Sequence, residues 1–249
     1  MLKMVAVCDT IPRMSQTTTD SNISRLFEAG AHFAHVKSRR HPSMRPYIAG
    51  TIAGMKTRVE IFDLEKTTKQ LSDAKKAMET LAKDGKTVLF VGGKGEVSDL
   101  VRQAAERINA PYVSTRWLGG TISNFTEIKK RIDRRADLVE KRTSGELAKN
   151  YTKLECLRFD REIDRLSERL DGIIDLAKLP DAIVIVDTRH EAHAVKEAHG
   201  AGIPVIGIMS SDCNLSDATY PIVANDASRA TVTLLLEELT DAYSHGRAV

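Results

Sequence analysis

The stretch PYVSTRWLGGTISNF, residues 111–125, marks the point at which one pattern of the sequence ends and another begins. Its apolar Tyr-Val pair predicts a short strand. Arg116 and Trp117, the only tryptophan, follow, and Gly119 and Gly120 favour a turn that leads into a strongly charged helix. An arginine beside an aromatic ring at a strand end suits stacking on a base or contact with phosphate. The alternative is a tryptophan in the core, the usual place of a large aromatic side chain.

On both sides of this stretch, strand patterns alternate with helix patterns. Apolar or alternating runs predict strands over residues 58–64, 87–91, 112–114, 182–187, 203–209 and 220–223. Amphipathic spacing predicts helices over residues 65–84, 96–108 and 190–201, and a last helix that Asp226 caps and that runs to residue 243. Such alternation is typical of an α/β protein with a doubly wound, mainly parallel sheet.

Two charged helical segments interrupt the alternation. Residues 126–142 carry apolar side chains at helical spacing, namely Ile128, Ile132, Ala136 and Val139. After the polar residues 143–150, apolar side chains recur at spacings of 3, 4, 3, 4 and 3, at Cys156, Phe159, Ile163, Leu166, Leu170 and Ile173. This is the spacing of a coiled-coil seam. The sequence therefore predicts an antiparallel α-helical coiled-coil hairpin inserted into the sheet domain.

These patterns divide the chain into four parts. They are a mobile N-terminal extension over residues 1–20, an α/β globular domain over 21–125 and 177–243, the inserted hairpin over 126–176, and a C-terminal tail over 244–249. Asp20 or Ser21 is expected to cap a short helix that Gly30 stops. Residues 30–50, with Pro42 and Pro46, are expected to form a loop or extended arm whose basic side chains are free to bind a partner.

Composition limits the classes of function. With 42% hydrophobic and 29% charged residues the chain is predicted to be soluble and globular, and a formal net charge of +3 does not by itself identify a nucleic-acid binder. The charge is uneven, because the window from Gly30 to Val59 holds six Lys and Arg and no Asp or Glu. Three widely spaced cysteines fit neither a disulfide framework nor a zinc cluster and favour a reducing cytosol. No apolar run approaches the ~20 residues of a membrane span, and no signal peptide is predicted.

Two stretches suggest ligand sites without matching a known pattern. Residues 92–95, Gly-Gly-Lys-Gly, would suit a phosphate at a helix start, but they lack the spacing and hydroxyl of a Walker loop and the last glycine of a dinucleotide fingerprint. Asp187 with His190 and His193 could hold a structural divalent metal; the alternative is an acidic strand end beside surface histidines. No nucleophile lies in a catalytic context, so we expect no catalysis and no cofactor.

Short motifs in a fixed order resemble those of one family. They are Gly30-Ala31-His32-Phe33 with His35 and Arg39, Pro42-x-Met44-x-Pro46-Tyr47-Ile48, Ile61-x-Asp63-Leu64-x-Lys66-Thr67, Leu89-Phe90-Val91-Gly92, Arg116-Trp117-Leu118-Gly119-Gly120 with Asn124-Phe125, Leu179-Pro180-Asp181-Ala182 with Asp187, His190 and Glu191, Gly202-Ile203-Pro204-Val205-Ile206, and Asn225-Asp226. Together they cover the chain from about Ser24 to Tyr243, and they resemble the bacterial type of ribosomal protein two of the small subunit. Ala34, Val36, Lys37 and the pair Arg40-His41 depart from the commonest residues of that family and leave the arm basic.

The resemblance implies a flavodoxin-like sheet with a projecting helical hairpin and no catalysis. It implies a structural constituent of the small ribosomal subunit in the cytoplasm, bound to small-subunit ribosomal RNA between head and body and next to other ribosomal proteins. In bacteria the family also helps to recruit ribosomal protein one. Neither a small-molecule substrate nor a membrane partner is implied.

The side chains expected to bind RNA are mostly basic. Cations of the arm would contact phosphates, which anchors a protein without reading sequence, and aromatic rings would stack on bases. Asn124 would contact RNA or cap the following helix, and the hairpin cations would contact RNA or form a solvated face. The predicted set is Lys37, Arg39, Arg40, Arg45, Tyr47, Arg116, Trp117, Asn124, Lys129, Lys130 and Arg134. Two alternatives stay open: a nucleotide- or sugar-phosphate-binding enzyme with its ligand near residues 92–95 and Asp187, and a protein adaptor whose hairpin alone binds.

Overall fold

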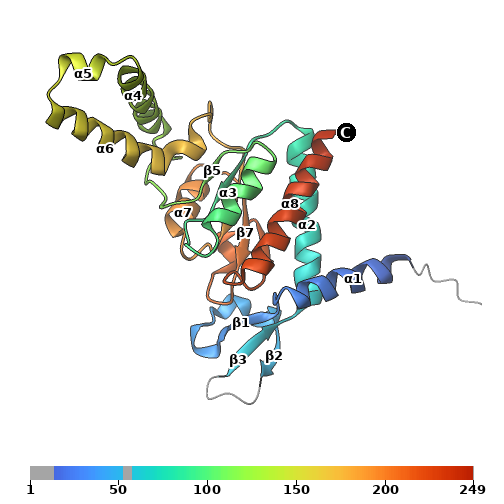
Figure 1. Cartoon of the computed structure of the whole chain (residues 1–249). Helices are drawn as coiled ribbons and strands as arrows, with labels where there is room; N and C mark the ends of the chain where they lie inside the picture. Colours follow the sequence, from blue (N-terminus) through green and yellow to red (C-terminus); the bar gives the residue numbers. More distant parts are fainter. Residues whose placement is uncertain (1–13, 53–57, 249) are drawn as a thin grey trace, which may run out of the picture.

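A sheet of five parallel strands forms the centre of the computed structural model, which describes residues 14–52 and 58–248 (Figure 1). Its strands are β4 (Val88–Val91), β5 (Tyr112–Val113), β6 (Ala182–Val186), β7 (Val205–Met209) and β8 (Tyr220–Val223). They lie in the order β5-β4-β6-β7-β8, with every neighbouring pair parallel. Numbered along the chain this order is 2-1-3-4-5, as in flavodoxin-like folds, so the predicted doubly wound parallel sheet is confirmed.

Helices cover both faces of this sheet. On one face α2 (Leu64–Lys83), α3 (Ser98–Arg107) and α8 (Arg229–Ala248) pack against side chains such as Phe90. On the other face α7 (Ala192–Gly200) and the loop that contains Trp117 pack against alternate side chains such as Leu89. Every residue of β4, β6 and β7 is buried, which explains their continuous apolar runs.

The segment predicted as a loop or extended arm is instead folded. It holds β1 (Phe33–Val36), two short 3-10 helices (Lys37–Arg39 and Pro42–Tyr47) and β2 (Ile48–Ile52). With β3 (Val59–Phe62) the two strands form a separate antiparallel sheet in the order β1-β3-β2. The prolines shape a 3-10 helix whose Met44 side chain is fully buried, so this segment is anchored in the core. We call the surface of residues 37–45 the arm.

Both chain ends are more helical than predicted. Helix α1 (Met14–Glu28) begins before the expected cap at Asp20 or Ser21, because neither proline nor glycine interrupts residues 14–28. Gly30, with φ +78°, follows that helix as predicted. Residues 14–20 therefore belong to a helix, and the rest of the predicted extension, 1–13, lies outside the described residues.

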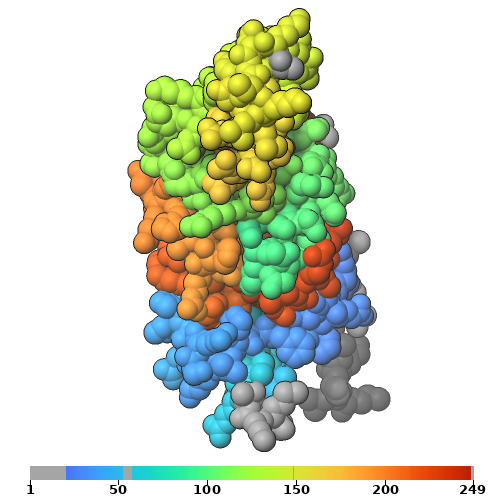
Figure 2. All heavy atoms as spheres, turned by 60° about the vertical axis from the view of Figure 1, so that its left-hand side comes forward, coloured from blue at the N-terminus to red at the C-terminus, as the bar shows by residue number. Residues whose placement is uncertain are grey.

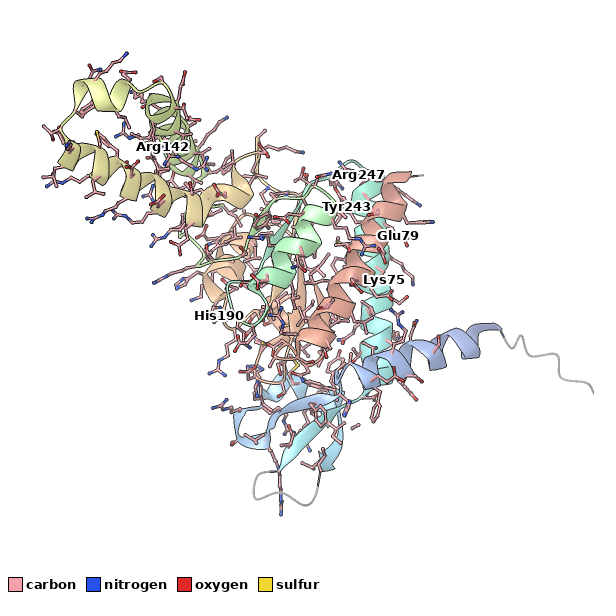
Figure 3. All side chains as sticks on the ribbon, in the orientation of Figure 1. Lys75, Glu79, Arg142, His190, Tyr243 and Arg247 are labelled. Atoms are coloured by element: carbon pink, nitrogen blue, oxygen red, sulfur yellow. The ribbon has the colours of Figure 1, made fainter. Side chains whose placement is uncertain are left out.

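Helix α8 corrects two expectations at the C-terminal end. Its N-terminal turn is capped by Ser228, whose Oγ accepts a hydrogen bond from the backbone N–H of Thr231 at 3.4 Å, and not by Asp226. It also continues through most of the predicted tail, because Arg247 donates to the carbonyl of Ile108 and lies over the ring of Tyr243 (Figure 3). These contacts keep the last turn against the body of the protein.

Three helices between β5 and β6 project from the sheet. They are α4 (Phe125–Thr143), α5 (Glu146–Asn150) and α6 (Lys153–Leu170), and they form one end of the molecule, opposite the antiparallel sheet (Figures 1 and 2). Arg135 in α4 forms an ion pair with Asp171 just after α6, and Arg142 one with Asp160, so the two long helices run in opposite directions. The predicted polar interruption contains the short helix α5, and a capping box of Thr152 and Glu155 starts α6.

The apolar side of α4 differs from the predicted one. Ile128 and Ile132 are buried as expected, but Ala136 is exposed and Leu138 is buried in its place. Between the buried Ile132 and Leu138, the half-buried Arg135 donates to Ser167 Oγ and forms an ion pair with Asp171, so an arginine stem covers the position where a seam residue would lie. In α6, Ile163 and Leu170 are buried, whereas Cys156, Phe159 and Leu166 are half-buried.

We expect Leu138→Ala to lower the free energy of unfolding by about 2–5 kcal/mol, because it removes a buried side chain and leaves a cavity. Ala136→Ser, at the exposed neighbouring position, should change it by no more than about 0.5 kcal/mol. Urea unfolding followed by circular dichroism measures both. Equal effects of the two substitutions would contradict this assignment of the buried side.

Candidate nucleic-acid interface

The arm presents three exposed cations on one short segment. Lys37 and Arg39 lie in the first 3-10 helix and Arg45 in the second. In the part of the chain that the structure describes, none of the three forms an ion pair. Charges that are not neutralised within the protein are available to neutralise phosphates, so these three predicted positions suit contact with a nucleic-acid backbone.

Arg40 differs from its neighbours on the arm. Its Nη1 lies 2.6 Å from Oε1 of Glu60, a residue of β3 that is only 3% exposed. A buried carboxylate is costly without a cation, so this ion pair has a structural role. Arg40 therefore fastens the arm to the antiparallel sheet, so its side chain is not free as expected, while its contact with RNA stays a prediction.

The two aromatic rings that were predicted to stack on bases are more buried than expected. Trp117 is 7% exposed, lies in the core against the sheet, and donates its indole N–H to Oε1 of Glu197 at 3.2 Å. The alternative of a core tryptophan is thus confirmed. Tyr47 is half-buried against the same core, and its carbonyl accepts a hydrogen bond from the backbone of Asp63. Neither ring is free on the surface of the arm.

The loop after β5 is organised around the carboxylate of Glu197, a residue of α7 that the sequence does not single out. Besides Trp117, the backbone N–H groups of Gly120, Ile122 and Ser123 donate to it at 2.8–3.2 Å. Burial alone would raise the pKa of Glu197, but these donors outweigh it and lower that pKa. The Gly-Gly turn serves to wrap backbone donors around an anion that the protein itself supplies.

Arg116 remains exposed at the mouth of a shallow pocket of about 400 Å³. His190 and His193 line the same pocket from the loop after β6 and the start of α7. The pocket lies at the carboxyl ends of β4 and β6, which is where ligands bind in sheets of this topology. Arg116 is therefore the one predicted cation of this region that stays accessible among the described residues.

The glycine-rich residues 92–95 make contacts that explain them without a phosphate. The backbone N–H of Gly93 donates to Oε1 of the buried Glu191 at 3.0 Å. A Cβ on Gly93 would lie 2.3 Å from the carbonyl oxygen of Thr115, so close packing requires glycine there. Lys94 Nζ lies 3.3 Å from Oδ2 of Asp187. Protein carboxylates thus engage two donors that a phosphate would use, the N–H of Gly93 and the ammonium of Lys94.

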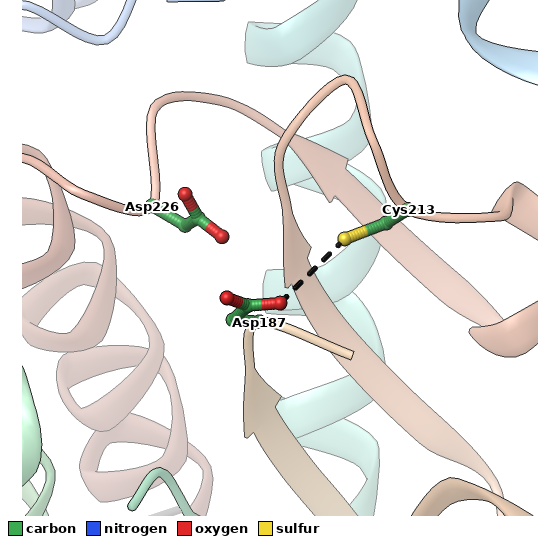
Figure 4. A group of neighbouring side chains, drawn as sticks. All are labelled: Asp187, Cys213 and Asp226. Carbon is green, nitrogen blue, oxygen red and sulfur yellow. Dashed lines mark hydrogen bonds between the residues drawn. The ribbon is translucent and has the colours of Figure 1, made fainter. Parts of the chain in front are cut away.

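One group of three potential metal ligands occurs among the described residues, and it differs from the predicted one. Oxygens of Asp187 and Asp226 and the Cys213 sulfur lie within 4.8 Å of one another (Figure 4). His190 and His193 are not part of it. Burial raises the pKa of Cys213 to about 12, and burial together with the charge of Asp187 raises the pKa of Asp226 to about 7. The thiol is thus protonated at neutral pH, and the ammonium of Lys94, beside both carboxylates, supplies a positive charge.

The predicted hairpin cations are exposed, but two of them have partners. Lys130 pairs with Glu127 at 2.6 Å, and Arg134 with Glu162 at 3.5 Å, whereas Lys129 forms no ion pair within the described part of the chain. Asn124 takes the N-cap position of α4, but its side chain accepts from the hydroxyl of Thr126 and caps no backbone N–H. Its predicted capping role is therefore wrong, and its side chain is exposed.

Comparison with known proteins agrees with the order of the sequence motifs. A family model described as ribosomal protein S2 matches residues 26–246. The small ribosomal subunit protein uS2 of Fusobacterium nucleatum is 40% identical over 225 residues, which cover 90% of each chain. Those of Dictyoglomus thermophilum and Acinetobacter baylyi are each 39% identical and cover 90% and 92% of this chain and 89% and 90% of their own. Among the described residues no helix is long and apolar enough to cross a membrane.

We expect Glu197→Gln to lower the free energy of unfolding at pH 7 by about 2 kcal/mol, because the amide turns a donor toward backbone N–H groups. The folded-state pKa of Glu197 is lowered, so its contribution is present above the unfolded value of about 4.3 and is lost as the pH falls further. The difference between wild type and variant should therefore shrink toward pH 3.

Urea unfolding at pH 7 and pH 3 measures this difference, and Glu237→Gln, an exposed carboxylate on α8, serves as the control. A stability difference at Glu197 that is the same at both pH values would contradict the role given to its charge.

Proposed function

Because this chain belongs to the ribosomal protein S2 family, we propose that it binds the RNA of the small ribosomal subunit through its basic arm. The family consists of structural proteins, so the chain is a constituent of the cytoplasmic ribosome and not an enzyme. The observation that carries the proposal is the set of three exposed cations on the arm, Lys37, Arg39 and Arg45, with no ion pair among the described residues.

The contacts of the arm support recognition of a backbone and not of a base sequence. Its exposed groups are an ammonium and two guanidiniums, which neutralise phosphates and release counterions. The ion pair of Arg40 with Glu60 and the buried Met44 hold these cations on a folded support. A preformed surface loses less conformational entropy on binding than a free loop would.

The location and neighbours of the protein are part of the same proposal. We place its binding site between the head and the body of the small subunit, and we assign it a part in recruiting ribosomal protein one, on the strength of the family resemblance. Arg116, Asn124 and Lys129 are further RNA contacts in this proposal, because each is exposed. No residue is assigned to the contact with ribosomal protein one.

We also propose that residues 126–176 form a separate unit inserted into the α/β domain of residues 21–125 and 177–243. Helices α4 and α6 would act together as an antiparallel coiled coil that reaches RNA or protein neighbours beyond the sheet. The opposed ion pairs of Arg135 and Arg142 support this arrangement. The exposure of Ala136 shows where the seam departs from the simplest heptad pattern.

Reversal of charge at Lys37, Arg39 and Arg45 to glutamate should remove the protein from small subunits, because phosphates would then repel the arm. Sedimentation of lysate through a sucrose gradient, with immunodetection of the full chain in each fraction, measures this. Wild type should sediment with small subunits and should dissociate as salt is raised.

A matched control reverses three exposed cations of α2 and α7, Lys69, Lys83 and Lys196, which form no ion pair among the described residues. This control should stay with the particles. Particle association of the arm variant equal to wild type would refute binding through the arm, and wild type found only in the slow soluble fractions would refute the ribosomal role.

A further inference from the structure

A second basic surface lies on the projecting helices, at positions that the sequence patterns do not single out. A groove of about 480 Å³ runs between α4, α6 and the loop after β5. Leu118, Leu166 and Leu170 contribute apolar lining, and Glu162 is its one carboxylate among the described residues. Its remaining lining consists of four arginines, Arg131, Arg158, Arg165 and Arg169, which we call the arginine groove.

The arginines of α6 follow the same spacing as its apolar side. Arg158, Glu162, Arg165 and Arg169 are 4, 3 and 4 residues apart, each one position before a residue of the apolar series at 159, 163, 166 and 170. They therefore form a stripe beside the contact between the helices, and Arg131 faces this stripe from α4. Along the helix axis Arg165 and Arg169 are about 6 Å apart, and Arg158 and Arg165 about 10 Å.

The arginine groove carries a net positive charge, because four arginines and one carboxylate, Glu162, line it. Each of the four side chains belongs to an exposed residue, and none forms an ion pair in the described part of the chain. Other hairpin cations do, because Arg134 contacts Glu162, Arg135 contacts Asp171 and Arg142 contacts Asp160. Glu162, the acidic residue of the groove, is thus already engaged by a cation outside it.

This combination fits the backbone of an RNA strand. Guanidinium groups bind phosphate through two parallel hydrogen bonds, and their weakly hydrated planes also stack on bases. A row of cations along one helix matches a ligand whose charges repeat, and apolar side chains beneath them suit the faces of bases. All four positions are arginine and none is lysine, whereas a merely solvated face has no need of that choice.

We infer that the arginine groove binds a segment of the RNA of the small ribosomal subunit. This inference rests on the proposed function, because it takes the same RNA as ligand at a second place on the chain. The arm and the groove lie toward opposite ends of the molecule (Figures 1 and 2), so the sheet between them spaces two RNA contacts. The groove carries RNA binding on the hairpin in place of the predicted cations Lys130 and Arg134, which have partners.

The test compares full-length proteins for rebinding to small subunits from which this protein has been removed. The groove variant carries Arg131→Gln, Arg158→Gln, Arg165→Gln and Arg169→Gln, which keep long polar side chains and remove four charges. We expect its affinity at low salt to fall at least tenfold. The slope of log affinity against log salt should become shallower by about 3, since each lost phosphate contact accounts for roughly 0.7–0.9.

A matched control changes four other exposed cations of α4, α5 and α6 to glutamine, Arg142, Lys149, Lys153 and Arg161, none of which lines the groove. It should lower affinity less than twofold and leave the slope unchanged. Thermal unfolding of both variants confirms that they are folded, as expected for substitutions at exposed positions.

Ultraviolet crosslinking identifies what the groove touches. Crosslinks from α6 to ribosomal RNA in wild type that disappear in the groove variant would support the inference. An unchanged affinity and slope in a folded groove variant, while wild type still binds, would overturn it and leave the proposed function in place. Crosslinks from α6 to a protein alone, with an unchanged salt slope, would overturn the assignment to RNA. Failure of wild type itself to rebind would refute the proposed function as well.

Discussion

The loop through which the chain leaves the sheet for the projecting helices is organised around one carboxylate, that of Glu197. It accepts hydrogen bonds from the loop between β5 and α4, including those from the indole of Trp117 and the backbone of Gly120. Burial of an anion is unfavourable unless donors replace its water, and here the backbone supplies them. Because this loop leads directly into α4, the direction in which the hairpin leaves the sheet depends on how these donors close around the anion.

Acidic side chains also accept hydrogen bonds from protein donors at the carboxyl edge of the sheet. Glu191 accepts a hydrogen bond from the backbone N–H of Gly93, and Asp187 accepts one from the ammonium of Lys94. On the antiparallel sheet, Glu60 forms an ion pair with Arg40. Each of these buried or half-buried acids therefore binds a donor that could otherwise have contacted an outside ligand. The cations left without partners in the described part of the chain lie mainly on the arm and on the hairpin, which suits a protein that binds and does not catalyse.

The sequence predicted the features that burial imposes along a single element. β4, β6 and β7 are buried on both faces, so their apolar runs identified them as strands. The sequence did not decide between a buried and an exposed Trp117, because its hydrogen-bond partner Glu197 lies 80 residues away in the chain. The sequence placed Ala136 on the buried side of α4, where the structure buries Leu138. The pattern is interrupted because the stem of Arg135 takes the place of an apolar residue. The fold of residues 30–50 was missed because its strands are short and only partly buried.

Ion pairing also distinguishes the cations of the candidate site from other basic residues on the surface. From composition, Arg40, Arg134 and the arginines of the groove are alike, since a sequence records a charge but not its nearest neighbour. The structure distinguishes them, because Arg40 and Arg134 are neutralised by Glu60 and Glu162. In the binding mode that we propose, two groups of cations without ion-pair partners, one on the arm and one on the projecting helices, contact a single polyanion, and each contact raises the effective concentration of RNA at the other. In this proposed mode the spacing between the two groups contributes to binding together with their charges, because linked contacts depend on whether one ligand can span both sites.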